Sequence, residues 1–383
     1  MPVVFVHGVN NRDGESYREN EFSRNGFLRE IVAPALGLVP DELSLLSPYW
    51  GQYGGNFAWG MASLPDPAEK PESFGAEAIQ RVAGLIAESE SSGKIVLDAQ
   101  KEFAGAVDLL YASAMAGAKS EEEARDLAKS YVLSAQYAQK EPQPAWIATA
   151  TPDNFADQLD YAADASRQER FGAGGILQSL KEGLSRLEGA AGAATSALGV
   201  RVLRKNLNAT VTRFAGDAFV YLNSRIAKDG KPGPIVATLI DDLLKARQAC
   251  THLDNKLIVI AHSFGGEIMY DIATHFAPDI KVDCLITVAS QVGLFEEMKL
   301  YVESRVDIPP DPPKGHIARP QAVQRWLNVF DTNDVLSYRL EPIMSDVADF
   351  YYNTGFNSLS AHGGYFMRPS FYQRIAARLS GEV

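Results

Sequence analysis

The chain is poor in cysteine and has no excess of basic residues. Only Cys250 and Cys284 occur among 383 residues. Two cysteines are too few for a disulfide framework, and they lack the CxxC spacing of metal or redox sites, so we expect two buried thiols in a reducing compartment. Lys and Arg number 36 against 48 Asp and Glu, a net charge of −12. This balance disfavours nucleic acids and anionic membrane surfaces as partners.

Long apolar runs are also missing. No stretch reaches the roughly 18 apolar residues that a membrane-spanning helix needs. The opening residues Met-Pro-Val-Val-Phe-Val-His-Gly show no basic region ahead of an apolar segment, so we expect no secretory signal. These absences predict a soluble, cytoplasmic protein without a transmembrane segment, and they leave peripheral contact with lipid open.

What is present is ordinary globular composition with alternating strands and helices. Hydrophobic residues make up 46% and charged residues 22% of the chain. An apolar run at 2–6, a helical pattern at 22–36 and a second apolar run at 43–47 predict a βαβ unit. The alternation resumes later, with helices expected at 235–250, 265–276 and 369–379 and strands at 256–260, 282–289, 326–330 and 349–353. This order predicts the α/β class, a mostly parallel sheet flanked by helices.

The middle of the chain has a different texture. Residues 61–202 are Ala-rich, helical in pattern and nearly free of β-branched runs, so we predict a large helical insertion (cap) between core segments 1–60 and 203–383. Ser120 and Glu123 form a predicted capping box. A leucine stripe favours a helix packed on its neighbours over a lipid-facing lid; its members are Leu177, Leu180, Leu184 and Leu187.

The strongest chemical signal follows the predicted strand at 256–260. The sequence Ile-Val-Ile-Ala-His-Ser-Phe-Gly-Gly at 258–266 runs from a strand into a helix through a small-x-Ser-x-Gly turn. This is the pattern of a nucleophile elbow, in which small residues flanking the serine, here Ala261 and Gly265, let helix and strand pass closely. Ser263 is therefore the predicted nucleophile, with His262 beside it as a supporting residue.

A serine hydroxyl needs a base and an orienting carboxylate, here in the chain order Ser, Asp, His. His362 is the histidine that follows the last carboxylate-bearing strand end, and we expect it in a loop at 360–365. The sequence Asp-Thr-Asn-Asp at 331–334 follows the strand at 326–330. We favour Asp334 as the acid over Asp331, which we expect to shape the turn; Asp346 and Asp349 are more remote alternatives.

The same chemistry needs two backbone N–H donors for an oxyanion. Phe264 follows the predicted nucleophile and supplies the first. Val9 is the predicted second donor, because it follows an early strand and the pair His7-Gly8, where glycine lets the backbone turn its amide inward. We also expect His7 and Gly8 to support the site.

Taken together, the motifs HGVNNR, PYWG, AHSFGG, DTNDVLS and SAHGGYF make the sequence resemble the α/β-hydrolase superfamily. The nearest likeness is to bacterial enzymes of the lipase and esterase type, a branch similar to GPI inositol-deacylase-like enzymes. The resemblance covers about two-thirds of the chain and leaves out the helical insertion. It implies the α/β-hydrolase fold, a triad of Ser263, Asp334 and His362, and a reaction without a metal or an organic cofactor.

These expectations predict a serine hydrolase that cleaves carboxylic esters through an acyl-enzyme, with a small-molecule or lipid ester as substrate. A peptidase or amidase and an acyltransferase use the same triad, and an inactive scaffold whose helical insertion binds a partner is a third alternative. The sequence does not set the oligomeric state. An aromatic group precedes the insertion, and we favour core packing over an acyl site for most of it: Tyr49, Trp50, Tyr53, Phe57 and Trp59.

Overall fold

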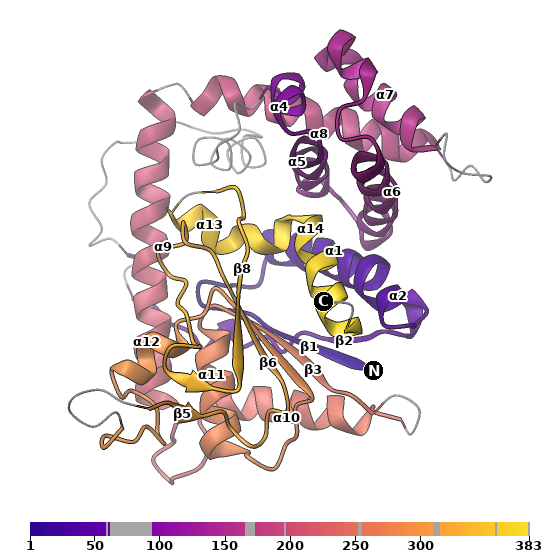
Figure 1. The fold of residues 1–383 in the computed structure, drawn as a ribbon. Coiled ribbons are helices and arrows are strands. Elements are labelled where there is room, and N and C mark those ends of the chain that lie inside the picture. The colour runs from indigo at the N-terminus through magenta and orange to yellow at the C-terminus, as the bar shows by residue number, and fades with distance from the viewer. Residues whose placement is uncertain are drawn as a thin grey trace. The chain divides into compact units, whose positions relative to one another are not determined.

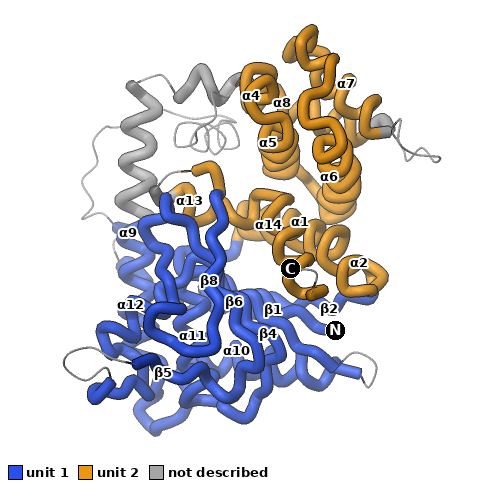
Figure 2. Tube along the Cα trace, viewed as in Figure 1, with its two compact units in different colours: residues 1–13, 42–65, 206–353 blue, residues 14–41, 66–205, 354–383 orange. Residues whose placement is uncertain are grey.

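A computed structural model describes residues 1–58, 60–61, 94–164, 173–194, 197–251, 255–308, 315–356 and 358–381. The chain divides into two compact units, which are coloured separately in Figure 2. Unit 1 comprises Met1–Asp13, Glu42–Pro65 and Asn206–Asn353, and unit 2 comprises Gly14–Asp41, Asp66–Lys205 and Thr354–Val383. The predicted insertion at 61–202 and its role as a cap stay predictions.

Unit 1 is built on a six-stranded sheet in which every neighbouring pair is parallel. The spatial order of its strands is β2-β1-β3-β4-β6-β8, and Figure 1 shows the twisted sheet edge-on among its helices. The strands are β1 (Pro2–Val6), β2 (Ser44–Leu46), β3 (Ile258–His262), β4 (Cys284–Val288), β6 (Trp326–Phe330) and β8 (Val347–Tyr351). This architecture confirms the predicted α/β class.

The central strands are apolar on both faces because both faces are covered. All five residues of β1 and of β4 are buried, as expected for strands inside a parallel sheet. One face packs on helices of unit 1, and the shared core contains Val4 of β1, Leu239 of α10 and Ile268 of α11. The helices of this unit are α9 (Ala197–Ser224, from residue 206 on), α10 (Pro234–Gln248), α11 (Gly265–Asp271) and α12 (Val292–Glu297).

Most predicted elements of unit 1 are confirmed, with shifts of a few residues at their ends. The strand at 326–330 is predicted residue for residue, whereas β3 begins two residues later than expected, at Ile258, where its ladder with β1 begins. The predicted helix 265–276 continues beyond α11 as a π-helical turn, Ile272–Phe276. The sequence did not predict α12 or the small two-stranded sheet of β5 (Ile317–Ala318) and β7 (Met344–Ser345).

The named elements of unit 2 are helices within its described residues. The predicted helix at 22–36 begins earlier, at Glu15, and contains a π-helical turn at Leu28–Val32. The helices of this unit are α1 (Glu15–Phe27), α2 (Ala33–Ala35), α4 (Ile95–Lys101), α5 (Phe103–Met115), α6 (Glu121–Lys140), α7 (Pro152–Asp164), α8 (Ala173–Ala194), α13 (Ser358–Gly364) and α14 (Pro369–Ser380).

Local signals in the helical region are confirmed. Ser120 caps α6, accepting a hydrogen bond from the N–H of Glu123 at 3.1 Å. The Glu123 carboxylate reaches back to the N–H of Lys119 at 2.9 Å, one residue before the cap. Three leucines of the predicted stripe on α8 are buried: Leu180, Leu184 and Leu187. The stripe therefore packs inside unit 2, with only Leu177 partly exposed.

Three other expectations are settled in part. Of the aromatic group before the insertion, for most of which we favoured core packing, Trp50 is fully buried and Tyr53 is 37% exposed; Trp59 lies outside the described residues. Cys284 is buried, as expected, but Cys250 at the end of α10 is partly exposed. Within the described part of the chain, no helix combines the length and the apolar character needed to cross a membrane.

Candidate active site

Ser263 occupies a strained turn between β3 and α11. Its φ angle is 50°, in the left-handed region that side chains with a Cβ rarely adopt. Backbone hydrogen bonds hold the turn. Ser263 N donates to Val288 O of β4, and Gly266 N donates to Ser263 O, both at 2.9 Å. Strain of this kind persists only where the surrounding structure imposes it, and it is common at functional sites.

Gly8, after β1, lies directly against Ser263. A Cβ added at Gly8 would stand 2.7 Å from Ser263 Cβ and 3.2 Å from Ser263 Oγ. Only glycine permits this approach, which brings the turn after β1 beside the predicted nucleophile. Two predicted site residues 255 positions apart in the chain, Gly8 and Ser263, are therefore neighbours in space.

The two glycines after the serine allow the helix to start close to the sheet. A Cβ at Gly265 would stand 2.6 Å from Val6 O, and one at Gly266 would stand 2.8 Å from Ser290 Cβ. The backbone N–H groups of Phe264 and Val9 donate no hydrogen bond within the described residues. Both of the predicted oxyanion donors are thus free of competing internal acceptors in the described part of the chain.

His7 is a buried structural histidine that shapes the turn after β1. Its Nε2 accepts from Trp50 N at 3.1 Å, which assigns the ring hydrogen to Nδ1, and Nδ1 donates to Gly8 O at 2.7 Å. The imidazole stacks on the Trp50 ring at 4.9 Å, and Trp50 Nε1 donates to His7 O at 2.9 Å. His7 therefore fixes the carbonyl of Gly8, and its supporting role in the site stays a prediction.

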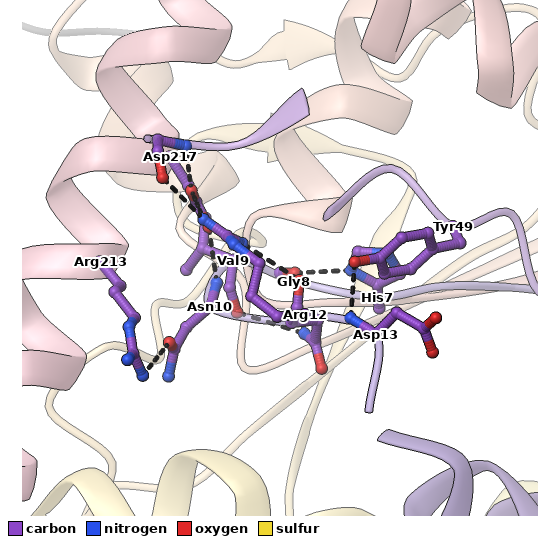
Figure 3. Close-up of polar contacts among 11 residues, drawn as sticks. His7, Gly8, Val9, Asn10, Arg12, Asp13, Tyr49, Arg213 and Asp217 are labelled. Carbon is purple, nitrogen blue, oxygen red and sulfur yellow. Dashed lines mark hydrogen bonds and ion pairs between the residues drawn. The ribbon is translucent and has the colours of Figure 1, made fainter. Parts of the chain in front are cut away.

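The rest of this turn is anchored by Asp217 of α9 (Figure 3). The Asp217 carboxylate is fully buried, and it accepts from Asn10 N at 2.7 Å and Gly55 N at 2.6 Å. Arg12 donates to both of its oxygens, at 3.0 and 2.6 Å. Four donors on one carboxylate hold the segment that follows Gly8, and Asn10 adopts a left-handed φ of 62° there.

Asp331 and Asp334 lie in one tight loop after β6, and both are buried. Each carboxylate closes its own turn, since Asp331 Oδ1 accepts from Asn333 N and Asp334 Oδ1 accepts from Leu336 N, both at 2.9 Å. Asp331 shapes the turn as expected, but Asp334 does so equally. Asp349, one of the remote alternatives, accepts hydrogen bonds from the side chains of Asn328 and Arg339.

His362 lies in α13 of unit 2, so the expectation of a loop at 360–365 is wrong. Ala361 and Tyr365, one helical turn apart, are both buried and favour the helix. α13 ends at Gly364, where an added Cβ would collide with the Phe356 ring, so this glycine permits close packing. The triad that joins His362 to Ser263 and Asp334 stays a prediction.

The sequence interpretation missed two groups that hold these loops. Asp217 is a single acidic residue inside a long helix, and no local pattern marks it. Glu267 of α11 is fully buried, and burial raises its pKa to about 8. An acid within the apolar stretch Gly-Gly-Glu-Ile-Met-Tyr was a signal that could have found it.

Within the described ranges no group of His, Cys, Asp and Glu has the arrangement of a metal site.

Comparison with known proteins adds a partial likeness. No protein-family model matches the chain. The chain is similar to a protein of Saccharomyces cerevisiae named as a probable mitochondrial phospholipase, with 30% identity over 109 residues. The match covers 26% of this chain and 15% of that protein, so the chain spans only a small part of its relative.

Proposed function

We propose that the protein is a serine hydrolase of the α/β-hydrolase fold that cleaves carboxylic esters, with phospholipid-type esters as the substrate class. Two lines support the proposal: the turn at Ser263 and the similarity to a protein named as a probable phospholipase. The observation that carries it is Ser263 itself, strained at φ 50° between a parallel strand and a helix, with Gly8 packed against it.

The reaction we propose is acyl transfer to Ser263. His362 takes the hydroxyl proton as Oγ attacks the ester carbonyl, and the same histidine then gives a proton to the departing alcohol. A water molecule afterwards releases the acyl group and restores the serine. Asp334 orients the imidazole and stabilises its charged form, with Asp331 holding the turn of the acid loop.

The negative charge that develops on the carbonyl oxygen needs preorganised donors. We assign this role to the N–H groups of Val9 and Phe264, which have no internal acceptor within the described residues. Phe264 is fixed by the elbow, and Val9 by its neighbours, since Gly8 packs on Ser263 and Asn10 is held by Asp217. Donors fixed in this way stabilise a transition state without reorganising during the reaction.

Labelling with a fluorophosphonate tests the nucleophile. Wild-type protein should be labelled at Ser263 and should hydrolyse nitrophenyl esters, and Ser263→Ala should lose both properties while keeping its thermal unfolding temperature. Ester hydrolysis that persists in Ser263→Ala would remove the assignment.

A substrate panel then separates the chemical classes. Nitrophenyl esters of increasing acyl length, matched anilides and phosphatidylcholine vesicles should be compared at equal enzyme concentration. We expect turnover of phospholipid and of long-chain esters above that of anilides. Preference for anilides would indicate an amidase, and a wild-type protein that takes no label would indicate an interaction protein on a hydrolase scaffold.

A further inference from the structure

Glu267 is a buried acid beside the predicted nucleophile that the proposed reaction does not use. It lies in the first turn of α11, four residues after Ser263, and is 0% exposed. Its Oε1 accepts from Gln291 N at 2.5 Å. Its Oε2 has no hydrogen-bond partner within the described residues, which is costly for a buried carboxylate.

The charges around Glu267 do not compensate an ionised form. Asp271, one helical turn on, is also fully buried and takes the nearby donors, Arg225 at 2.8 Å and the Tyr221 hydroxyl at 2.9 Å. Tyr221, Tyr270 and Tyr301 are buried neutral phenols of the same neighbourhood, and none of them supplies a positive charge. No described cation forms an ion pair with Glu267, and its raised pKa follows from burial and from Asp271.

A proton on Glu267 gives its buried carboxyl group a donor that the ionised form lacks. Gln291 Oε1 is buried and also has no partner within the described ranges. Glu267 already accepts a hydrogen bond from the backbone N–H of Gln291. These two residues therefore carry two buried acceptor oxygens, Glu267 Oε2 and Gln291 Oε1, that receive no hydrogen bond within the described residues. A neutral carboxyl supplies one O–H donor in addition to its acceptor oxygen, and it therefore matches this environment better than a carboxylate.

Gln291 connects this pair to the loop that carries the predicted acid. Its Nε2 donates to Ala289 O and to Leu336 O. Leu336 N donates to Asp334 Oδ1 at 2.9 Å. A parallel backbone bond runs from Tyr338 N to Ser290 O at 3.1 Å. Segment 289–291 thus links α11, which begins beside Ser263, with the loop that holds both candidate carboxylates.

We propose that Glu267 is a positioning residue that, in its neutral form, holds Gln291 and through it fixes the acid loop relative to the helix that follows Ser263. The inference deepens the proposed function and rests on it for its catalytic consequence. The connection itself is independent of catalysis, because it consists of hydrogen bonds among described residues of unit 1.

Two substitutions test whether Glu267 acts through its hydrogen bonds. Glu267→Gln keeps the acceptor oxygen for Gln291 N and supplies an uncharged donor in place of the O–H, so we expect kcat within about threefold of wild type. Glu267→Ala removes both groups, and we expect kcat to fall by about tenfold or more with KM changed by less than about twofold. Wild-type kcat should decline as pH rises through about 8, and Glu267→Gln should lack this decline.

Glu296→Gln is the matched control. Glu296 is a buried acid of the same unit, bonded to Lys299 and Ser304 rather than to the acid loop. This variant should keep both wild-type kcat and the wild-type alkaline decline.

Hydrogen exchange measures the connection without using activity. In a Ser263→Ala background, Glu267→Ala should speed exchange at residues 331–338 by about tenfold, and Glu267→Gln and Glu296→Gln should not. Unchanged exchange in Glu267→Ala, or equal defects in Glu267→Ala and Glu267→Gln, would overturn the proposal. A wild-type protein without hydrolase activity would refute the proposed function instead, and the exchange result would still decide whether Glu267 positions the loop.

Discussion

Replacing Glu267 by glutamine should stabilise unit 1, and the gain should grow with pH. The ordinary pKa of 4.5 applies in the unfolded chain, whereas burial raises the pKa in the folded protein to about 8. Between these values the folded protein holds a proton that the unfolded chain has lost. The contribution of neutral Glu267 to the free energy of unfolding is therefore fully present below about pH 4.5. It is lost as pH rises from there to about 8.

The size follows from the two pKa values. A difference of about 3.5 units corresponds to about 5 kcal/mol in total, of which about 3 kcal/mol is lost by pH 7. Glutamine cannot ionise and escapes this loss. The advantage of Glu267→Gln in unfolding free energy should rise by about 3–4 kcal/mol between about pH 5 and 8 and flatten above.

Urea unfolding at several pH values provides the assay. The chain has four tryptophans, and only Trp146 belongs to unit 2. Trp146→Phe in both proteins therefore makes the fluorescence report on unit 1 alone. Stability curves of the two proteins that run parallel across this pH range would refute the reasoning, because they would mean that Glu267 titrates equally in both states.

Three further predictions test the loops around Ser263. Gly8→Ala should reduce fluorophosphonate labelling by about tenfold or more, because its Cβ would meet Ser263 Cβ at 2.7 Å, whereas Gly14→Ala, whose Cβ meets nothing within 4 Å, should label normally. Asp217→Ala should lower the unfolding free energy by about 3–5 kcal/mol, because it leaves Arg12 and two backbone N–H groups without their buried acceptor. Asp229→Ala, which removes an exposed ion pair, should not change the melting temperature. Asp334→Asn should reduce kcat by about 10⁴-fold and Asp331→Asn far less, since asparagine preserves the turn at either position; equal losses would contradict the choice of Asp334.

Local patterns made much of unit 1 predictable. Strands buried on both faces appear as continuous apolar runs, so β1 was recognisable from a few residues. The turn at Ser263 was also readable, because a strand, a small residue, a serine and two glycines occur together in sequence. The two-residue strands β5 and β7 are too short to show any period.

The contacts that hold the site could not be read from the sequence. Arg12 and Asp217 meet across 205 residues of sequence, and no periodic pattern relates them. Gln291 reaches Leu336 across 45 residues through a side-chain amide, which has no sequence signature. His362 was expected in a loop, whereas the segment is helical and buries Ala361 and Tyr365. Gly364 in fact makes room for the Phe356 ring.

The all-parallel sheet also bears on how the nascent chain folds. Val3 of β1 pairs with Ile258 of β3, so β1 leaves the ribosome about 250 residues before its central partner. At about 5–20 residues per second, translation takes about 13–50 s to supply that partner. For that time the run Pro-Val-Val-Phe-Val has, among the described strands, only the short edge strand β2 to pair with. It is the segment of the growing polypeptide where we expect chaperones to bind.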